Sequence, residues 1–460
     1  MAKLLFVISI ILIHFVQQCT LKVEGYTRAD FPSDFIFGSG TSAYQVEGAA
    51  TEDGRTRSIY DTWAFQVTGE YAGDVACDEY HKYKEDVQLM VETGVDAYRF
   101  SISWTRLIPN GTGAINQKGV DYYNNLINEL IKNGIQPHVT LLQFDFPQVL
   151  QDAYGGWMDQ QMVMDFTAYA EVCFKEFGDR VLHWTTINEP IAVVLLFYDD
   201  LNPYIAAHNL LLGHASVVNL YRQKFQEKQN GSIGLNQHAR WFLPATNTKR
   251  DIMACERASM FVNDWFTHPI VYGDYPNKMK LYLGTKLPSF TKEESKLVKG
   301  SFDFIAINCY TASIVEDDPQ ASSFLLCFKA KCNDKVIGGK FIQGALEHLK
   351  QVYGNPPVYI HENGLRTFRN VSFNDTSRIT YLNASIGSML DSLRNGSNVK
   401  GYFQWSFLDL FEFSQHNEYG FGLYYVDLQS SELRRYPKRS ALWYSNFLKG
   451  KPSQSYLASE

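Results

Sequence analysis

The sequence predicts a single (β/α)8 barrel of the α/β class, because short apolar runs alternate with helical segments along the whole chain. Eight such runs occur, at residues 35–42, 97–103, 137–143, 183–188, 232–237, 304–308, 357–361 and 401–406. Amphipathic stretches of helical period, such as 123–134 and 166–178, lie between them. No linker and no solenoid repeat interrupts the pattern, so we expect one domain over residues 26–460. A doubly wound sheet is the alternative.

Residues 1–25 are typical of a secretory signal peptide. Lys3 precedes an apolar run over 4–16, and polar residues follow that run. The run is too short to span a bilayer comfortably, so we expect cleavage within 20–26 and no membrane association afterwards. A retained anchor or a buried helix is the alternative. The expected location is the secretory pathway, ending in the extracellular space or cell wall, or in the vacuole.

Secretion leads us to expect N-glycosylation, and six asparagines stand in acceptor sequons. They are Asn110, Asn230, Asn370, Asn374, Asn383 and Asn395. The chain has 7 Cys, of which Cys19 leaves with the signal peptide. Cys327 and Cys332 are close enough in sequence for a disulfide, although buried free thiols are an equal alternative. No cysteine spacing typical of a metal site occurs.

The composition argues against several classes of partner. A net charge of −7 without a long run of Lys or Arg argues against nucleic acid. Gly38 to Ala43 matches G-x-G-x-x-A after a predicted strand, but no second strand with an acidic end follows where a dinucleotide site needs one. We therefore expect a small-molecule substrate with no cofactor and no metal. The oligomeric state stays open.

In a barrel, functional side chains lie at the carboxyl ends of the strands. Six of the predicted strands end in polar or aromatic residues, namely Arg99, Gln143, Asn188–Glu189, Asn308–Tyr310, Glu362 and Trp405. Glu189 and Glu362 would face each other across the mouth. Two carboxyl groups about 5 Å apart are what a retaining glycosidase needs, one as an ionised nucleophile and one as a proton donor. Arg99 can keep Glu362 ionised. A helix start at Glu189 and a turn at Glu362 are the alternatives.

Several motifs in order resemble those of glycoside hydrolase family 1, and within it the plant β-glucosidases. FPSDFIFGSGTSAYQVEGA resembles the family's N-terminal signature, TINEP its acid/base motif and IHENG its nucleophile motif. YRFSISWTRLIPNG and GYFQWSFLDLFEF also match in place. The likeness runs from Phe31 to the C-terminus and implies a barrel enzyme that cleaves β-D-glucosides with retention.

The resemblance also implies a role for each matching residue. Glu189 would be the general acid/base and Glu362 the nucleophile, with Arg99 supporting the nucleophile. The implied substrate-binding residues are Gln45, Gln143, Asn188, Tyr310, Trp405, Glu412, Phe413 and Phe421. Without the resemblance, a core aromatic at Trp405 and a solvated helix end at Glu412 are the plainer interpretations.

The chain departs from the family pattern at four residues. Gln143 replaces a usual His, Phe413 a usual Trp and Cys309 a common His. His361 stands where many members have Thr, as in a plant subgroup that includes sugar-ester-dependent glucosyltransferases. The stretches after TINEP and between 310 and 356 are also shorter than usual, and both fall beside the mouth.

Several activities therefore stay open. The first is β-glucoside hydrolysis, and the second is transfer of the same glucosyl intermediate to an acceptor hydroxyl from a glucose ester or a glucoside. The shortened loops also allow a catalytically impaired variant, or a sugar-binding protein without catalysis. Retention of both glutamates argues against the last of these. Glu189 argues against the branch that hydrolyses sulfur-linked glucosides, which commonly has Gln there.

Overall fold

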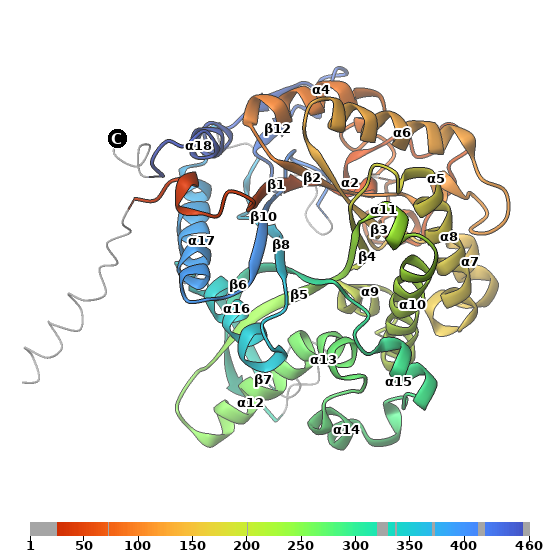
Figure 1. The fold of residues 1–460 in the computed structure, drawn as a ribbon, viewed down its shortest axis with the longest axis vertical. Coiled ribbons are helices and arrows are strands. Elements are labelled where there is room, and N and C mark those ends of the chain that lie inside the picture. The colour runs from red at the N-terminus through yellow and green to blue at the C-terminus, as the bar shows by residue number, and fades with distance from the viewer. Residues whose placement is uncertain are drawn as a thin grey trace, which may run out of the picture.

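The structure is a computed structural model that describes residues 25–71, 73–199, 201–319, 330–335, 338–369, 373–412 and 419–453. Eight parallel strands close into a barrel, and helices surround it (Figure 1). In spatial order the barrel strands are β1 (Ile36–Gly40), β2 (Ala97–Ser101), β3 (Gln136–Leu142), β4 (His183–Asn188), β5 (Ser232–Pro244), β6 (Phe304–Asp317), β8 (Val358–Asn363) and β10 (Val399–Trp405). The predicted barrel is confirmed, and the pairing of β5 with β6 excludes an open doubly wound sheet.

The helices lie outside the strands because each has one apolar face to bury. The longer ones are α3 (Ile59–Thr68), α4 (Glu79–Thr93), α6 (Gln117–Lys132), α8 (Gln161–Phe177), α10 (Pro203–Lys224), α12 (Lys249–Ser259), α16 (Lys340–Tyr353), α17 (Thr376–Arg394) and α18 (Arg439–Leu448). The shorter ones are α2 (Ala43–Val46), α5 (Trp104–Leu107), α7 (Gln148–Tyr154), α9 (Pro190–Phe197), α11 (Gln226–Gln229), α13 (Trp265–Tyr272), α14 (Asn277–Leu283) and α15 (Lys292–Val298). Both helical stretches singled out in the sequence fall largely on α6 and α8. In α6 the buried residues Tyr123, Leu126, Ile127 and Leu130 recur at helical spacing.

Each of the eight predicted runs overlaps a barrel strand, but two strands extend far beyond the predicted bounds. β5 and β6 continue past the barrel wall and stay paired up to Pro244 and Val315. There β7 (Ala330–Lys335) adds to β6 in antiparallel orientation. The prediction ended both strands at the first polar residues. Backbone pairing continues beyond that point because it does not require an unbroken apolar sequence.

Small sheets and turns complete the fold. β9 (Thr367–Phe368) pairs with β11 (Tyr419–Gly420), and β12 (Tyr424–Val426) pairs with β13 (Arg435–Pro437). Short 3-10 helices occur at Arg28–Asp30, Gly156–Met158 and Gly284–Lys286, and a π-helical turn at Met260–Asp264. Within the described ranges, none of the helices combines the length and apolar character that a membrane crossing requires.

The interior of the barrel is filled with side chains. An apolar cluster contains Phe304, Tyr359 and Phe403 together with Ala97 and Ala306. Buried His138 packs against this cluster, with its ring centroid 4.8 Å from that of Phe403. The barrel is therefore a packed core rather than a pore, and a site can form only at its mouth.

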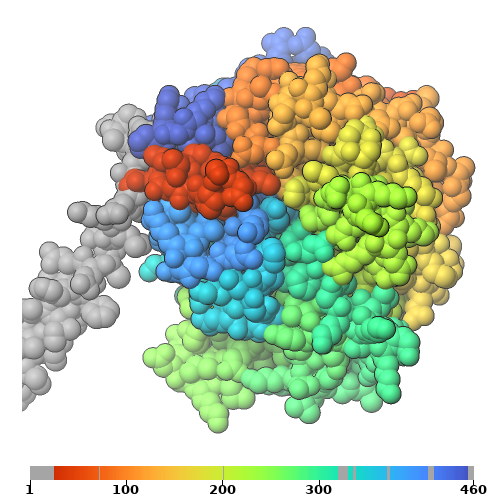
Figure 2. Space-filling view, viewed as in Figure 1, coloured from red at the N-terminus to blue at the C-terminus, as the bar shows by residue number. Residues whose placement is uncertain are grey.

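The beginning of the described chain packs against α17 and α18 (Figure 2). The Tyr26 hydroxyl donates to the main-chain oxygen of Asn383 at 2.6 Å, and the Tyr26 ring lies edge-on to Phe447 at 5.7 Å. Asn383 itself is only 4% exposed. This burial leaves little room for a glycan, which makes Asn383 the least accessible of the five described sequons, and glycosylation there stays a prediction.

The other predicted glycosylation sites differ in their surroundings. Asn110, Asn230, Asn374 and Asn395 are exposed, while Asn370 lies outside the described residues. The predicted disulfide also stays a prediction, because Cys327 lies outside the described residues as well. Cys77, Cys173, Cys255 and Cys309 are free thiols.

Candidate active site

Glu362 on β8 is held by donors from two other strands. Arg99 of β2 donates from Nη1 to Glu362 Oε1 at 2.5 Å, and the Tyr310 hydroxyl of β6 donates to Oε2 at 2.7 Å. Both carboxylate oxygens are therefore oriented by hydrogen bonds. The side chains of Arg99 and Glu362 are 0% and 6% exposed. A buried charge pair is tolerated when further hydrogen bonds satisfy its polar atoms, as Tyr310 does here for Glu362.

The residues that follow Glu362 explain the rest of its motif. Asn363 donates from Nδ2 to the Cys309 carbonyl and to the Tyr381 hydroxyl, and its Oδ1 accepts from the Tyr402 hydroxyl. A Cβ at Gly364 would lie 1.9 Å from the Trp405 carbonyl oxygen, so only glycine fits there. Asn363 and Gly364 thus hold the end of β8 against the neighbouring strands β6 and β10.

Glu189 follows β4 and directly precedes Pro190, the first residue of α9. Its φ of 42° and ψ of 66° place it in the left-handed region, which is uncommon for a residue with a side chain. Its side-chain Oε1 accepts from Asn308 Nδ2 at 2.9 Å and lies 3.2 Å from His238 Nδ1. The strained backbone and the two partners together fix the position of the carboxylate.

A network of amides connects the two glutamates. Arg99 Nη2 donates to Asn188 Oδ1 at 2.7 Å, and the same oxygen accepts from Nδ2 of Asn236 at 2.5 Å and of Asn308 at 3.1 Å. Asn188 is the residue before Glu189, and Arg99 also binds Glu362. The two predicted catalytic residues therefore belong to one continuous hydrogen-bond network at the mouth of the barrel.

The pKa values of the two carboxyl groups move in opposite directions. Burial raises the pKa of Glu362, Arg99 opposes this rise and the charge of Glu189 adds to it. Burial alone would also raise the pKa of Glu189, but His238, Asn308 and Arg99 together bring it below its ordinary value. The predicted contact between Arg99 and Glu362 is present. Arg99 lowers the pKa of Glu362 as expected, and burial acts in the opposite direction with the larger effect.

Two of the residues implied to bind the substrate meet beside Glu362. Gln45 of α2 is buried and donates from Nε2 to the carbonyl of Phe411, which precedes Glu412. Burial raises the pKa of Glu412 to about 8, and the charge of Glu362 contributes to the rise. Among the residues that the structure describes, none hydrogen-bonds to buried Glu412 Oε1, so this oxygen is available to a ligand hydroxyl.

The remaining predicted residues surround the same mouth. Trp405 is the last residue of β10, and the ring of Phe421 lies 5.7 Å from that of Tyr310. Gln143 follows β3 and its Oε1 accepts weakly from Arg99 at 3.5 Å. Phe413 lies outside the described residues. All the described members of the predicted set therefore come from strand ends or from the segments that follow them.

The sequence analysis missed His238 and Asn236 of β5. Both contribute to the network around Glu189. His238 is the first residue after the predicted strand 232–237, so the rule that functional residues follow barrel strands would have found it. Asn236 lies inside the predicted strand, and nothing in its sequence context distinguishes it from an ordinary strand residue.

Two residues that depart from the family pattern are buried away from this network. His361 lies inside the barrel, its ring centroid 5.4 Å from that of Phe403, and within the described ranges neither ring nitrogen has a hydrogen-bond partner. Burial holds the pKa of His361 well below its usual value. Cys309 of β6 is buried, and its Sγ lies 3.9 Å from the carbonyl oxygen of Phe341 on α16. Neither residue joins the carboxylate network.

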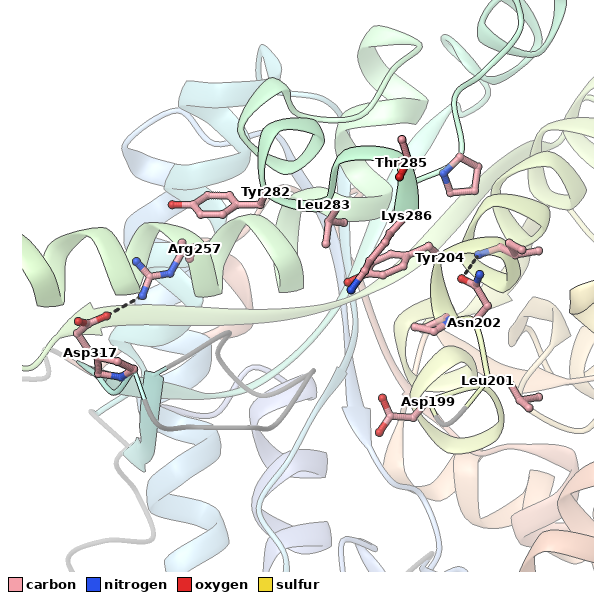
Figure 3. Close-up of a pocket in the computed structure, with 14 residues that line it drawn as sticks. Asp199, Leu201, Asn202, Tyr204, Arg257, Tyr282, Leu283, Thr285, Lys286 and Asp317 are labelled. Carbon is pink, nitrogen blue, oxygen red and sulfur yellow. Dashed lines mark hydrogen bonds and ion pairs between the residues drawn. The ribbon is translucent and has the colours of Figure 1, made fainter.

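A cavity of 1030 Å³ lies where the two shortened stretches meet. Residues 199 and 201–205 line one side of it, and Asp317 and Pro319 line another (Figure 3). The Arg257 guanidinium binds Asp317 at 2.8 Å along its wall, and Tyr282 belongs to the same wall. The lining contains none of the predicted site residues.

Comparisons with known proteins show what the chain is similar to. The chain is 50% identical over 455 residues to the cyanidin 3-O-glucoside 5-O-glucosyltransferase (acyl-glucose) of Dianthus caryophyllus, covering 94% of this chain and 90% of the relative. It is 48% identical over 488 residues to β-glucosidase 11 of Arabidopsis thaliana, covering 92% and 93%. The solved structure of rice Os3BGlu6 β-glucosidase superposes with a TM-score of 0.88 at 40% identity, covering 92% of this chain and 99% of that one.

The sequence profile of glycosyl hydrolase family 1 matches residues 27–452, nearly the whole described chain. The resemblance drawn from the motifs is therefore confirmed. The match also agrees with the parallel barrel. The chain belongs to glycosyl hydrolase family 1 and is a glycosidase.

Proposed function

We propose that this glycosidase cleaves β-D-glucosides with retention, through a covalent glucosyl-enzyme on Glu362. One observation carries the proposal: both oxygens of Glu362 are oriented by Arg99 and Tyr310, in the network that also holds Glu189. A nucleophile must present one defined lone pair to the anomeric carbon. The second carboxyl group of the retaining mechanism is then Glu189.

The proposed reaction has two steps. Glu362 attacks the anomeric carbon, the bond to the aglycone oxygen breaks with its electron pair on oxygen, and Glu189 gives that oxygen a proton. Water then attacks the glucosyl ester while Glu189 takes a proton from it, and Glu362 leaves as a carboxylate. The network supports this exchange because Arg99 compensates the charge on Glu362 before and after the ester exists.

The glucosyl unit would lie between Gln45, Glu412 and Trp405. The unpartnered oxygen of Glu412 accepts a sugar hydroxyl, and the adjacent Gln45 amide has a second N–H to offer. Trp405 supplies an apolar face for the C–H side of the ring. Asn188 and Gln143 complete the polar contacts at the Arg99 side.

The test is mass spectrometry of the intact protein after incubation with 2,4-dinitrophenyl 2-deoxy-2-fluoro-β-D-glucoside. The fluorine slows breakdown of the intermediate, so we expect one added fluoroglucosyl group that maps to Glu362. Glu362→Gln is the control and should gain no mass. Absence of an adduct on the folded wild-type protein would refute the proposal in favour of the impaired or purely sugar-binding protein.

The second candidate is a transglucosidase that uses the same intermediate with an acceptor hydroxyl in place of water. The relative from Dianthus is named as such an acyl-glucose-dependent enzyme. The cavity where the shortened stretches meet offers room for a bulky acceptor. Hydrolysis and transfer are separated by the ratio of free to transferred glucose with a phenolic acceptor present, and transfer below detection removes the second candidate.

We also propose secretion, with residues 1–25 as the cleaved signal, and a location in the extracellular space, the cell wall or the vacuole. The exposed sequons at Asn110, Asn230, Asn374 and Asn395 support glycosylation at those positions. Release of glycans by an endoglycosidase, followed by site mapping, tests this expectation. Unmodified asparagines in protein isolated from its natural source would contradict it.

A further inference from the structure

Arg369 holds the stretch of backbone that leads into Glu412. It directly follows β9, and its Nη2 donates to the carbonyl of Leu410, two residues before Glu412. Its Nε donates to the carbonyl of Tyr419 at 3.1 Å. One side chain therefore ties together two segments of backbone, one of which carries a residue implied to bind the sugar.

The same guanidinium acts on Glu412 without occupying its free oxygen. Arg369 Nη1 and Glu412 Oε1 are both buried, and neither has a hydrogen-bond partner among the residues that the structure describes. Burial raises the pKa of Glu412, and Arg369 is the strongest of the charges that lower it. Arg99, by contrast, binds the carboxylate of Glu362 directly. Arg369 thus supports a negative charge on Glu412 and leaves Oε1 free for a ligand.

Two acidic groups near Glu412 act against its ionisation. After burial, Asp409 and Glu362 are the remaining causes that raise the pKa of Glu412. Each of these carboxylates has a cation of its own: Lys438 lies 2.6 Å from Asp409 Oδ2, and Arg99 binds Glu362. Neither cation is among the charges that lower the pKa of Glu412.

The other groups that face Glu412 contribute less than Arg369. Arg366 lowers the pKa of Glu412 to a smaller extent. Burial raises the pKa values of Tyr60 on α3 and Tyr310 on β6 well above their usual range, and the charge of Glu412 adds to both rises. Both phenols therefore stay neutral. Arg369 is the main positive charge that acts on Glu412.

The charge on Glu412 matters because sugar hydroxyls are hydrogen-bond donors. A carboxylate accepts from hydroxyls at both oxygens, and bonds to an ionised acceptor are stronger than bonds to a neutral one. We propose that Arg369 is a positioning residue for substrate binding, which presents Glu412 to the sugar hydroxyls as a carboxylate. This inference rests on the proposed glucosyl site and adds to it a residue that the family motifs did not imply. Arg369 touches no reacting atom.

The expected pH dependence follows from the pKa of Glu412, which burial raises to about 8. Below this pH the carboxyl group must lose its proton when the sugar binds, so the dissociation constant rises as the pH falls. Without the charge of Arg369 the pKa of Glu412 moves higher, and the rise begins at a higher pH. Proteins with and without this charge should therefore differ most near pH 7 and converge at about pH 10, where Glu412 is ionised in both.

The experiment measures the dissociation constant of phenyl 1-thio-β-D-glucoside, a neutral substrate analogue, by isothermal titration calorimetry over a range of pH. Wild type is compared with Arg369→Gln, which removes the charge, and with Arg369→Lys, which keeps it. We expect Arg369→Gln to weaken binding at pH 7 about tenfold, the equivalent of one pKa unit, and Arg369→Lys to restore most of the affinity. Arg366→Gln is the matched control, because exposed Arg366 carries the same charge on the same segment and should matter little. With phenyl β-D-glucoside, Arg369→Gln should raise KM and leave kcat nearly unchanged.

The outcomes separate this inference from the proposed function. If wild type forms no fluoroglucosyl adduct and binds no analogue, the glucosyl site itself is refuted. If wild type forms the adduct but Arg369→Gln binds the analogue as wild type does at every pH, only the role of Arg369 is overturned. An equal loss of affinity at every pH would also overturn it, because Arg369 would then only hold the backbone. Should Arg369→Gln not fold, proton release by wild type at pH 7 decides: about one proton per bound analogue, absent in Glu412→Gln, supports the inference, and no release overturns it.

Discussion

Arg99 and Glu362 form an ion pair in which neither side chain is more than 6% exposed. The same guanidinium donates to Asn188, the residue before Glu189. One cation therefore sets the relative positions of the two strand ends that carry the glutamates. The planar guanidinium of Arg99 donates to two acceptors in fixed directions, which the ammonium group of a lysine cannot do.

We expect Arg99→Lys to reduce kcat by about 10²–10³-fold, the usual cost of losing one oriented donor at a reacting centre. Steady-state kinetics with an aryl glucoside measure this loss. Arg106→Lys is the matched control, because Arg106 is also buried and paired, with Glu47. That variant should lose stability with little change in kcat, and equal losses of kcat in both variants would contradict the role given to Arg99.

Gly364→Ala should destabilise the fold, because the added methyl would lie 1.9 Å from the Trp405 carbonyl oxygen. Overpacking against atoms that cannot move away costs about 1–3 kcal/mol or more. Thermal unfolding measures the effect. Gly40→Ala is the control, since a Cβ there meets nothing closer than 3.4 Å. Equal melting temperatures for the two variants would show that the backbone around Gly364 and Trp405 shifts to accommodate the added methyl group.

The buried histidines predict a loss of stability in acid. Burial keeps the pKa of His361 well below its usual value, so this residue is neutral in the folded protein. The unfolded chain binds its proton below its ordinary pKa, and stability therefore falls as the pH drops through that value. The slope is about 1.4 kcal/mol per pH unit for each such histidine.

In His361→Thr, the free energy of unfolding should fall less steeply as the pH drops, by about 1.4 kcal/mol per pH unit. Urea unfolding between pH 7 and pH 4 measures the difference. Exposed His81 provides the control, because its pKa is raised, mainly by a hydrogen bond to Asp78. His81→Thr should not flatten the acid slope. An unchanged slope in His361→Thr would mean that His361 titrates normally in the folded chain.

The cavity between the shortened stretches makes a prediction about acceptor size. Leu201 is 63% exposed and lines the cavity. Leu201→Trp should raise KM for a bulky phenolic acceptor about tenfold, the loss of roughly 1.4 kcal/mol of binding, and leave a small alcohol unaffected. Leu442→Trp on α18 controls for added aromatic surface. If Leu201→Trp leaves the KM of both acceptors unchanged, the acceptor does not bind in this cavity.

The sequence predicted the barrel and both glutamates because strand ends leave a strong pattern. Glu362 follows an apolar run, which marks the end of a strand. Gly364 belongs to its motif because a side chain at this position would collide with the Trp405 carbonyl oxygen. The pattern was weaker at β5, where the consecutive polar residues Asn236, Gln237 and His238 hid a strand that continues to Pro244. His238 was therefore missed although it lies one residue beyond the predicted end.

Other features depend on contacts between distant segments and leave no local pattern. Asn383 stands in a sequon, yet its burial against Tyr26 follows from packing across 357 residues of chain. The net pKa of Glu362 likewise depends on how completely the fold buries it. An ion pair with Arg99 could be expected from the strand order, but the amount of water excluded could not.

The packed interior of the barrel has a kinetic consequence. Because Phe304, Tyr359 and Phe403 fill the interior of the barrel, substrates enter and products leave through the same opening at the mouth. In the proposed mechanism, the first product has to depart before water or an acceptor can approach the glucosyl ester. Donor and acceptor therefore take turns, and double-reciprocal plots at several acceptor concentrations should give parallel lines. The released acid or aglycone will compete with the acceptor for the same entrance.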